Sequence, residues 1–240
     1  MNLHLVRMNL HRENLIRFAR KHDLLASRDD DFGYVLHAWL KAMFAEAAPK
    51  PFYFDTRHIV CYGYSGTDAE TLAENAQAFA DPFAHRVLVA DSLVGKPMPQ
   101  QWRIGKRLEL HVRACPITRK GGTEKDAFLR ALDRWTEKGE TPDEKPVRAE
   151  IYRQWFEEQI DPGILLVEHL AVEGMRARGA WLRRSRASSP FGLRVIERPE
   201  AHFRAVVTIR NAEGFANLLK RGIGRHRSFG FGMIRLMPAT

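Results

Sequence analysis

The chain has 240 residues, of which 45% are hydrophobic and 28% charged, a balance that is ordinary for a globular protein. No segment reaches the roughly 18 to 20 apolar residues that a membrane-spanning helix requires. Two cysteines, Cys61 and Cys115, are too few for a disulfide framework, and neither has a Cys or His neighbour at zinc-finger spacing. We therefore expect a cytoplasmic protein that has no membrane segment, no metal site and no cofactor.

Positive charge is concentrated toward the C-terminal end of the chain. The formal net charge is +9, and the segment from Arg176 to Arg235 holds fourteen Lys and Arg residues against three acidic ones. Such a basic segment on a nearly neutral body is typical of a protein that binds a polyanion. Nucleic acid is favoured over a membrane, because the basic residues alternate with strand-like segments and do not form an amphipathic helix. A solubilising surface is the alternative.

The first half of the sequence predicts the element order β-α-β-β-α-β. The expected elements are a strand at 1–9, helices at 11–25 and 32–47, strands at 51–54 and 58–64, a helix at 67–80 and a closing strand at 107–113. The polar run from Ser27 to Asp31 is suited to start the second helix. This order is that of a ferredoxin-like unit, the architecture of RNA-recognition modules.

The second half is less regular. Its expected elements are helices at 124–138 and 147–160, a strand at 164–172, an arginine-rich loop or hairpin, a strand at 203–209, a helix at 211–221 and a final strand at 231–237. We expect an α+β protein with two tandem ferredoxin-like domains, residues 1–116 and 117–240, and a C-terminal glycine-rich loop.

The most specific motif is this loop, Gly222 to Gly232, between the last helix and the last strand. Its four glycines let the backbone adopt positive φ angles and approach a partner closely. Exposed N–H groups in such a loop can bind phosphate oxygens, and Arg225 and Arg227 add positive charge. The dinucleotide-binding fingerprint does not fit, because that motif follows a strand and opens a helix. A tight helix-to-strand turn is the alternative.

The loop resembles that of the CRISPR repeat-processing endoribonucleases, in particular the CasE family of type I-E Cascade complexes. That family carries Gly-apolar-Gly, five residues, Gly-x-Gly and a short apolar strand, and residues 222–236 reproduce this pattern. Residues 106–116 are similar to the family's basic strand, with Cys115 in place of an asparagine. Residues 123–129 and 203–209 resemble the following helix and a later strand of the family.

The resemblance implies cleavage of RNA beside a repeat hairpin without a metal. The RNA's own 2′-OH attacks the adjacent phosphate, which leaves a 2′,3′-cyclic phosphate and a 5′-OH, and the enzyme retains the processed guide. It also implies that a histidine on the first helical region, with a tyrosine one turn before it, carries the chemistry, and Tyr34 and His37 match this arrangement. The expected partners are the CRISPR repeat RNA hairpin and other Cascade subunits.

The spacing around His37 suits such chemistry. Tyr34, His37 and Lys41 fall at i, i+3 and i+7, on one stripe beside the apolar face of the expected helix. The imidazole titrates near neutrality and can accept the 2′-OH proton or protonate the leaving 5′-oxygen. Tyr34 can orient the attacking group, and Lys41 can offset charge on the phosphate. A histidine that only fills surface or core is the alternative, and His226 is the rival catalytic candidate.

Further residues are expected to hold the RNA. The segment 176–186 resembles the family's basic hairpin, and the planar guanidinium of arginine suits contacts with phosphates. Arg119 and Lys120 would form a second basic patch. The expected RNA-binding residues are Arg119, Lys120, Arg176, Arg178, Arg183, Arg184, Arg186, Gly222, Gly224, Arg225, His226, Arg227 and Ser228.

Two other functions stay open at this point. A non-catalytic RNA-binding subunit could share the ferredoxin-like unit and the glycine-rich loop; a Tyr34–His37 pair facing that loop would argue against it. A metal-dependent nuclease needs clustered carboxylates, for which Asp29 to Asp31 is the one candidate. Adjacent acidic residues point in different directions, so capping and solvation are favoured for that run.

Overall fold

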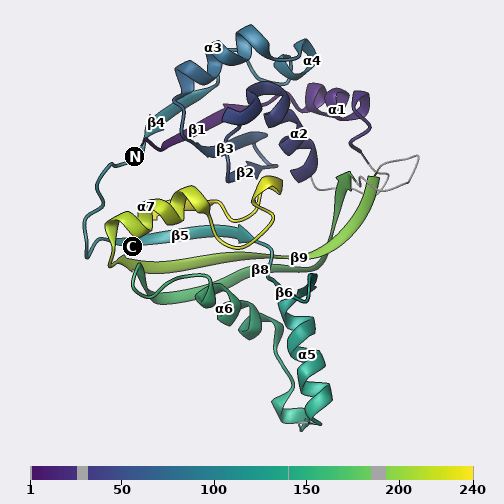
Figure 1. The fold of residues 1–240 in the computed structure, drawn as a ribbon, viewed down its shortest axis with the longest axis vertical. Coiled ribbons are helices and arrows are strands. Elements are labelled where there is room, and N and C mark those ends of the chain that lie inside the picture. The colour runs from purple at the N-terminus through teal and green to yellow at the C-terminus, as the bar shows by residue number, and fades with distance from the viewer. Residues whose placement is uncertain (1, 26–31, 140, 185–192, 240) are drawn as a thin grey trace.

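The computed structural model describes residues 2–25, 32–139, 141–184 and 193–239, with the backbone alone described for 177–184 and 193–197. The molecule is elongated, with two sheets lying one above the other (Figure 1). Helices cover the outer side of the upper sheet, and a helical arm projects below the lower one (Figure 1). The helix at 212–221 and the loop that follows it lie between the two sheets, which brings together segments far apart in the sequence (Figure 1).

The N-terminal part of the chain forms the upper sheet. Its strands are β1 (His4–Asn9), β2 (Phe52–Asp55), β3 (Val60–Ser65) and β4 (Val94–Pro97), in the antiparallel order β2-β3-β1-β4. Its helices are α1 (Arg12–Lys21), α2 (Gly33–Phe44), η1 (Ala45–Ala47), α3 (Ala69–Phe79) and α4 (Pro82–His85).

Helix α2 forms because its apolar residues recur at helical spacing. Val35, Leu36, Trp39, Leu40, Met43 and Phe44 are all buried against the upper sheet, as the sequence predicts. The Trp39 indole donates a hydrogen bond to the carbonyl of Ala84 at 2.9 Å, which ties α2 to α4. The acidic run expected to start this helix lies outside the described residues.

The C-terminal part forms the lower sheet and a small hairpin. Its strands are β5 (Arg107–Ala114), β8 (Leu165–Arg184), β9 (Leu193–Ile209) and β10 (Ile234–Pro238), in the antiparallel order β10-β5-β9-β8. The hairpin pairs β6 (Ile117–Lys120) with β7 (Thr123–Asp126). The helices are α5 (Ala127–Lys138), η2 (Pro142–Glu144), α6 (Arg148–Glu158), α7 (Ala212–Arg221) and η3 (Arg227–Phe229).

The expected α+β class is confirmed, with two antiparallel four-stranded sheets. Both sheets have the same relative strand order, and each follows the chain order β-α-β-β-α-β when the extra short elements are set aside. This arrangement is consistent with two tandem ferredoxin-like units.

One expected strand forms but belongs to the other sheet. The strand at 107–113 was expected to close the first unit, but β5 lies between β10 and β9 in the lower sheet. The upper sheet is closed by β4, whose four residues are all exposed and include a glycine and a proline, so that no strand pattern marks it in the sequence. The division between the sheets therefore falls between β4 and β5, before residue 116.

Several element starts were also wrong; the strand expected from residue 203, for example, begins at Leu193. Two of these differences have a local physical reason. The helix expected from residue 124 begins at Ala127, because Thr123–Asp126 pairs with β6 and the Asp126 carboxylate caps the helix by accepting from the Phe128 N–H at 2.8 Å. The last strand begins at Ile234 and not at residue 231, because the glycine-rich loop extends through Gly232.

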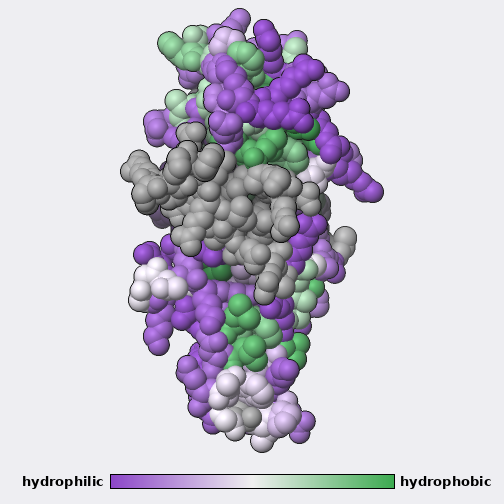
Figure 2. Space-filling view, turned by 90° about the vertical axis from the view of Figure 1, so that its right-hand side faces the viewer, coloured by the Kyte–Doolittle hydropathy of each residue, from purple (hydrophilic) through white to green (hydrophobic). Residues whose placement is uncertain are grey.

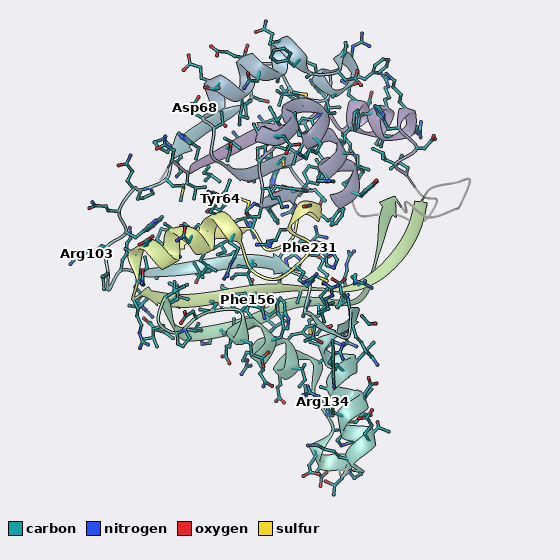
Figure 3. The ribbon with its side chains drawn as sticks, in the orientation of Figure 1. Tyr64, Asp68, Arg103, Arg134, Phe156 and Phe231 are labelled. Carbon is teal, nitrogen blue, oxygen red and sulfur yellow. The ribbon has the colours of Figure 1, made fainter. Side chains whose placement is uncertain are left out.

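Aromatic side chains form the core between the lower sheet and its helices. Phe156 of α6 stacks on Phe203 of β9 at 4.5 Å between ring centroids, and Phe215 of α7 meets Trp102 edge to face at 4.8 Å. Figure 3 shows Phe156 at the lower sheet and Tyr64 in the layer above it. The buried Tyr64 hydroxyl donates to the Ile234 carbonyl at 2.9 Å, a hydrogen bond between β3 and β10 that joins the two sheets.

The glycine-rich loop is closed by its own backbone. The Ile223 N–H donates to the Gly232 carbonyl at 2.9 Å, and the Gly232 N–H donates to the Arg113 carbonyl at 2.7 Å. Gly222 and Gly232 have φ angles of +72° and +74°, and a Cβ on either residue would collide with backbone of the opposite arm. These two glycines therefore let the two arms of the loop approach each other. Among the described helices, none is long and apolar enough to cross a membrane.

Replacing Gly232 by alanine should destabilise the protein. The added Cβ would collide with the Ile223 carbonyl oxygen, and alanine is also strained at the positive φ of this position. We therefore expect the free energy of unfolding, measured with urea, to fall by about 2 kcal/mol or more. Gly122→Ala is the matched control, because Gly122 has a similar φ of +82° with open space around its Cβ position. Equal losses for both variants would contradict the proposed close contact.

Candidate active site and RNA interface

The ring of Phe229, in η3, packs against two side chains of α2. The His37 ring meets it edge to face at 5.5 Å between centroids, and the Tyr34 ring stacks on it at 6.1 Å. Tyr34 and His37 are both half-buried, one helical turn apart. The expected pair therefore faces the glycine-rich loop, and the site joins residues nearly 200 positions apart in the sequence.

A cavity of about 190 Å³ opens beside His37. Its walls come from α2, the segment that leads into β2, and the glycine-rich loop. The lining residues are His37, Leu40, Lys41, Glu46, Ala48, Pro49, Lys50, Phe52 and Ser228. The imidazole, two ammonium groups and a hydroxyl thus share one small cavity, a combination that suits the binding and transfer of a phosphoryl group.

Burial and positive charge act together on His37. Burial, followed by the charges of Lys41 and Lys50, lowers the pKa of His37 below its ordinary value. The imidazole is therefore neutral at pH 7 and has a lone pair available to accept a proton. Lys41 lines the cavity, and its ammonium forms a 2.9 Å ion pair with Glu46, which takes up part of its charge.

Lys50 is a site residue that the sequence reasoning missed. It lies thirteen positions after His37, beyond the end of α2, so no helical spacing connects the two residues. The η1 turn reverses the chain, and the Lys50 N–H donates to the Tyr64 carbonyl at 2.8 Å, which fixes the backbone at this point. Its side chain is exposed at the cavity, and it has no ion pair within the described part of the chain.

His226 lies in the loop but not in the lining of the cavity. Its Nε2 is 3.0 Å from a carboxylate oxygen of Glu124, in β7, and its ring lies 6.2 Å from that of Phe229. Burial, together with the charges of Arg198 and Arg225, lowers the pKa of His226, although the Glu124 carboxylate opposes this shift. His37 therefore lines the cavity, whereas His226, the other catalytic candidate, contacts Glu124 outside it.

The remaining loop residues divide into exposed and internal groups. Arg225 is exposed and Ser228 lines the cavity, whereas the half-buried Arg227 donates to the Arg221 carbonyl. Gly222 is buried, and a Cβ on Gly224 would lie 2.9 Å from the Trp155 ring. These two glycines therefore let the loop pack closely against other residues of the same chain.

The other basic residues expected to bind RNA lie on the lower sheet and its hairpin. Arg119 and Lys120 are exposed at the end of β6, and Arg176 is exposed on β8. Three further arginines, Arg178, Arg183 and Arg184, lie on β8, where only the backbone is described. Arg186 lies outside the described residues. Polar side chains predominate on the described surface seen end-on to these strands (Figure 2).

No group of three or more His, Cys, Asp or Glu side chains that could hold a metal ion is present among the described residues. The Asp29 to Asp31 run lies outside them. Both cysteines are buried, and burial raises the pKa of each thiol, so each is packed as a small core residue.

The fold is shared with known RNA-processing proteins. A structure of the CRISPR endoribonuclease Cse3 bound to a 19-nucleotide RNA is 16% identical over 99% of this chain and 100% of its own, with a TM-score of 0.63. Cse3 of Thermus thermophilus, bound to an RNA that represents a pre-cleavage complex, is 16% identical with the same coverage and a TM-score of 0.62. Cas6e of Escherichia coli K-12 is 16% identical over the whole of both chains, with a TM-score of 0.57.

The chain shares the fold of these Cse3 and Cas6e proteins over nearly its whole length. Residues 3–238 match the family described as CRISPR associated protein, and the chain belongs to that family. No curated protein matches the sequence significantly. At identities of 16% the structural likeness establishes the fold, so the activity has to be argued from the site.

Replacing Lys50 by methionine should raise the pKa of His37. Methionine keeps the unbranched shape of the lysine stem, and the substitution removes one of the two positive charges that lower the pKa of His37. The pKa of the imidazole can be followed by NMR titration of its ring protons. Lys96→Met, in β4, is the control and should leave the His37 titration unchanged. An unchanged His37 pKa in the Lys50 variant would contradict its place at the cavity.

Proposed function

We propose that this protein is a metal-independent endoribonuclease that cleaves CRISPR precursor RNA beside the repeat hairpin. The observation that carries the proposal is the half-buried Tyr34–His37 pair, packed on Phe229 of the glycine-rich loop at a cavity with two lysines. Membership of a CRISPR-associated family and the fold of RNA-bound relatives support RNA as the substrate.

The proposed reaction is an in-line attack within the RNA. His37, neutral at pH 7, accepts the proton of a 2′-OH, whose oxygen attacks the adjacent phosphorus. The bond to the 5′-oxygen breaks, that oxygen takes a proton from water, and protonated His37 returns its proton to the solvent. The products carry a 2′,3′-cyclic phosphate and a 5′-OH. Tyr34 orients the attacking group, while Lys41 and Lys50 offset the negative charge that develops on the phosphate.

The exposed basic residues would hold the hairpin and retain the processed guide. Four basic side chains are exposed: Arg119 and Lys120 on the β6–β7 hairpin, Arg176 on β8 and Arg225 on the glycine-rich loop. Each can contact phosphates of an A-form RNA stem. A solved relative forms part of a CRISPR RNA-guided surveillance complex. We therefore propose other subunits of such a complex as partners of this chain.

The alternative is an RNA-binding subunit that does not cut. It would need the basic surface but would not need a phenol and an imidazole half-buried beside two lysines. Burial of polar rings costs free energy, so their joint placement at one cavity supports catalysis.

Replacing His37 by alanine should abolish cleavage and leave binding intact. The RNA is transcribed from the CRISPR repeat encoded beside the gene and incubated with the protein in excess EDTA. We expect the single-turnover rate to fall by about two to four decades with little change in RNA affinity. His58→Ala is the control, because His58 is exposed and paired with Asp55. Binding without cleavage by the wild type would support the non-catalytic alternative, and cleavage by the His37 variant would contradict the assignment.

The pH dependence of cleavage should report the lowered pKa of His37. A general base must be unprotonated, so the rate should be constant at neutral pH and fall as the pH drops through a value below that of an ordinary histidine. Single-turnover rates between pH 4.5 and 8 measure this profile. A rate that instead falls toward alkaline pH would assign His37 as the general acid.

A further inference from the structure

Glu124 lies where three basic segments of the chain meet. It is in β7, where it pairs with Arg119 of β6 in the strand register. Its carboxylate also reaches Arg198 of β9 and the glycine-rich loop. The side chain is only 16% exposed, although it lies among groups that a phosphate ligand would use.

The two carboxylate oxygens of Glu124 accept from three positively charged or protonatable groups. One oxygen accepts from Arg225 Nε at 2.8 Å; the other accepts from a terminal guanidinium nitrogen of Arg198 at 3.2 Å and lies 3.0 Å from His226 Nε2. Although burial opposes it, His226, Arg225 and Arg198 hold the pKa of Glu124 below its usual range. The carboxylate is therefore charged at neutral pH, and its hydrogen bonds are charge-assisted.

The contacts continue from Glu124 to the cavity. His226 has a φ of +60°, and its carbonyl accepts from the Phe229 N–H at 2.8 Å, so it starts the single turn that presents Phe229. Phe229 then packs on Tyr34 and His37. The left-handed conformation of a non-glycine residue costs free energy, and a hydrogen-bonded side chain can hold the residue in it.

We infer that Glu124 is a positioning residue for the proposed cleavage reaction. It acts through His226 and Arg225, which it fixes so that η3 holds Phe229 against Tyr34 and His37. This inference rests on the proposed function for its kinetic consequences, but not for its structural ones.

The variant Glu124→Gln keeps the size of the side chain and removes its charge. We expect the single-turnover cleavage rate to fall by about ten- to a hundredfold, as for a small misplacement of catalytic groups. The dissociation constant for the RNA should stay the same or decrease, because a negative charge beside Arg225 and Arg198 is removed and the positive potential that attracts phosphates rises. Glu168→Gln is the control, since Glu168 pairs with Arg107 at the opposite end of β5. An unchanged cleavage rate, or parallel losses of binding and cleavage, would overturn the inference.

A double-mutant cycle tests the route through His226. If Glu124 acts through this residue, Glu124→Gln combined with His226→Gln should slow cleavage no more than the more damaging single change. Effects that multiply would show that Glu124 acts on the site by another route, and would overturn the inference.

Amide hydrogen exchange gives a readout that needs no RNA. In Glu124→Gln the N–H groups of Phe229 and Gly232, both hydrogen-bonded in the loop, should exchange faster, while that of Leu10, bonded to the Ile59 carbonyl in the upper part of the molecule, should not change. If the loop exchanges faster in the variant but the wild type does not cleave RNA, the proposed function is refuted and the positioning role of Glu124 in the loop still holds. Unchanged loop exchange would refute the positioning role alone.

Discussion

The packing of Phe229 on Tyr34 and His37 is the interaction on which the site depends. It is the point at which the last helix-to-strand connection of the lower half touches the second helix of the upper half. Without it, His37 would be a histidine beside an apolar helix face, more exposed to water and with a more ordinary pKa. The ring covers part of the imidazole, and burial together with the charges of Lys41 and Lys50 lowers its pKa.

Several constraints in the C-terminal part of the chain serve to place that ring. Gly222 and Gly232 bring the two arms of the loop into contact, and Arg113 fixes the second arm through its carbonyl. Phe231 packs under the Arg113 guanidinium at 4.4 Å, at the base of the same loop, where Figure 3 places it between η3 and β5. The glycine pattern thus has an internal reason, which is the precise placement of the residues between the glycines.

The sequence predicted the elements that carry a strong period or a specific motif. The apolar face of α2, the helix before the glycine-rich loop and most strands agree with the structure, and the resemblance of the loop led to the correct family. Residues set by tertiary contacts could not be predicted. The strand β4 has no alternation of apolar and polar residues, and Lys50 lines the cavity although it lies beyond the end of α2. Glu124 contacts Arg225 and His226 of the loop, which follow it in the sequence by 101 and 102 residues.

The most direct test of the account is the replacement of Phe229 by alanine. If this ring assembles the site, the single-turnover rate on repeat RNA should fall by about tenfold or more, with RNA affinity retained and the pKa of His37 moved toward its ordinary value. Phe79→Ala, at a side chain that is 85% exposed on α3, is the control and should cleave like the wild type. An unchanged cleavage rate and an unchanged His37 pKa in the Phe229 variant would contradict the account.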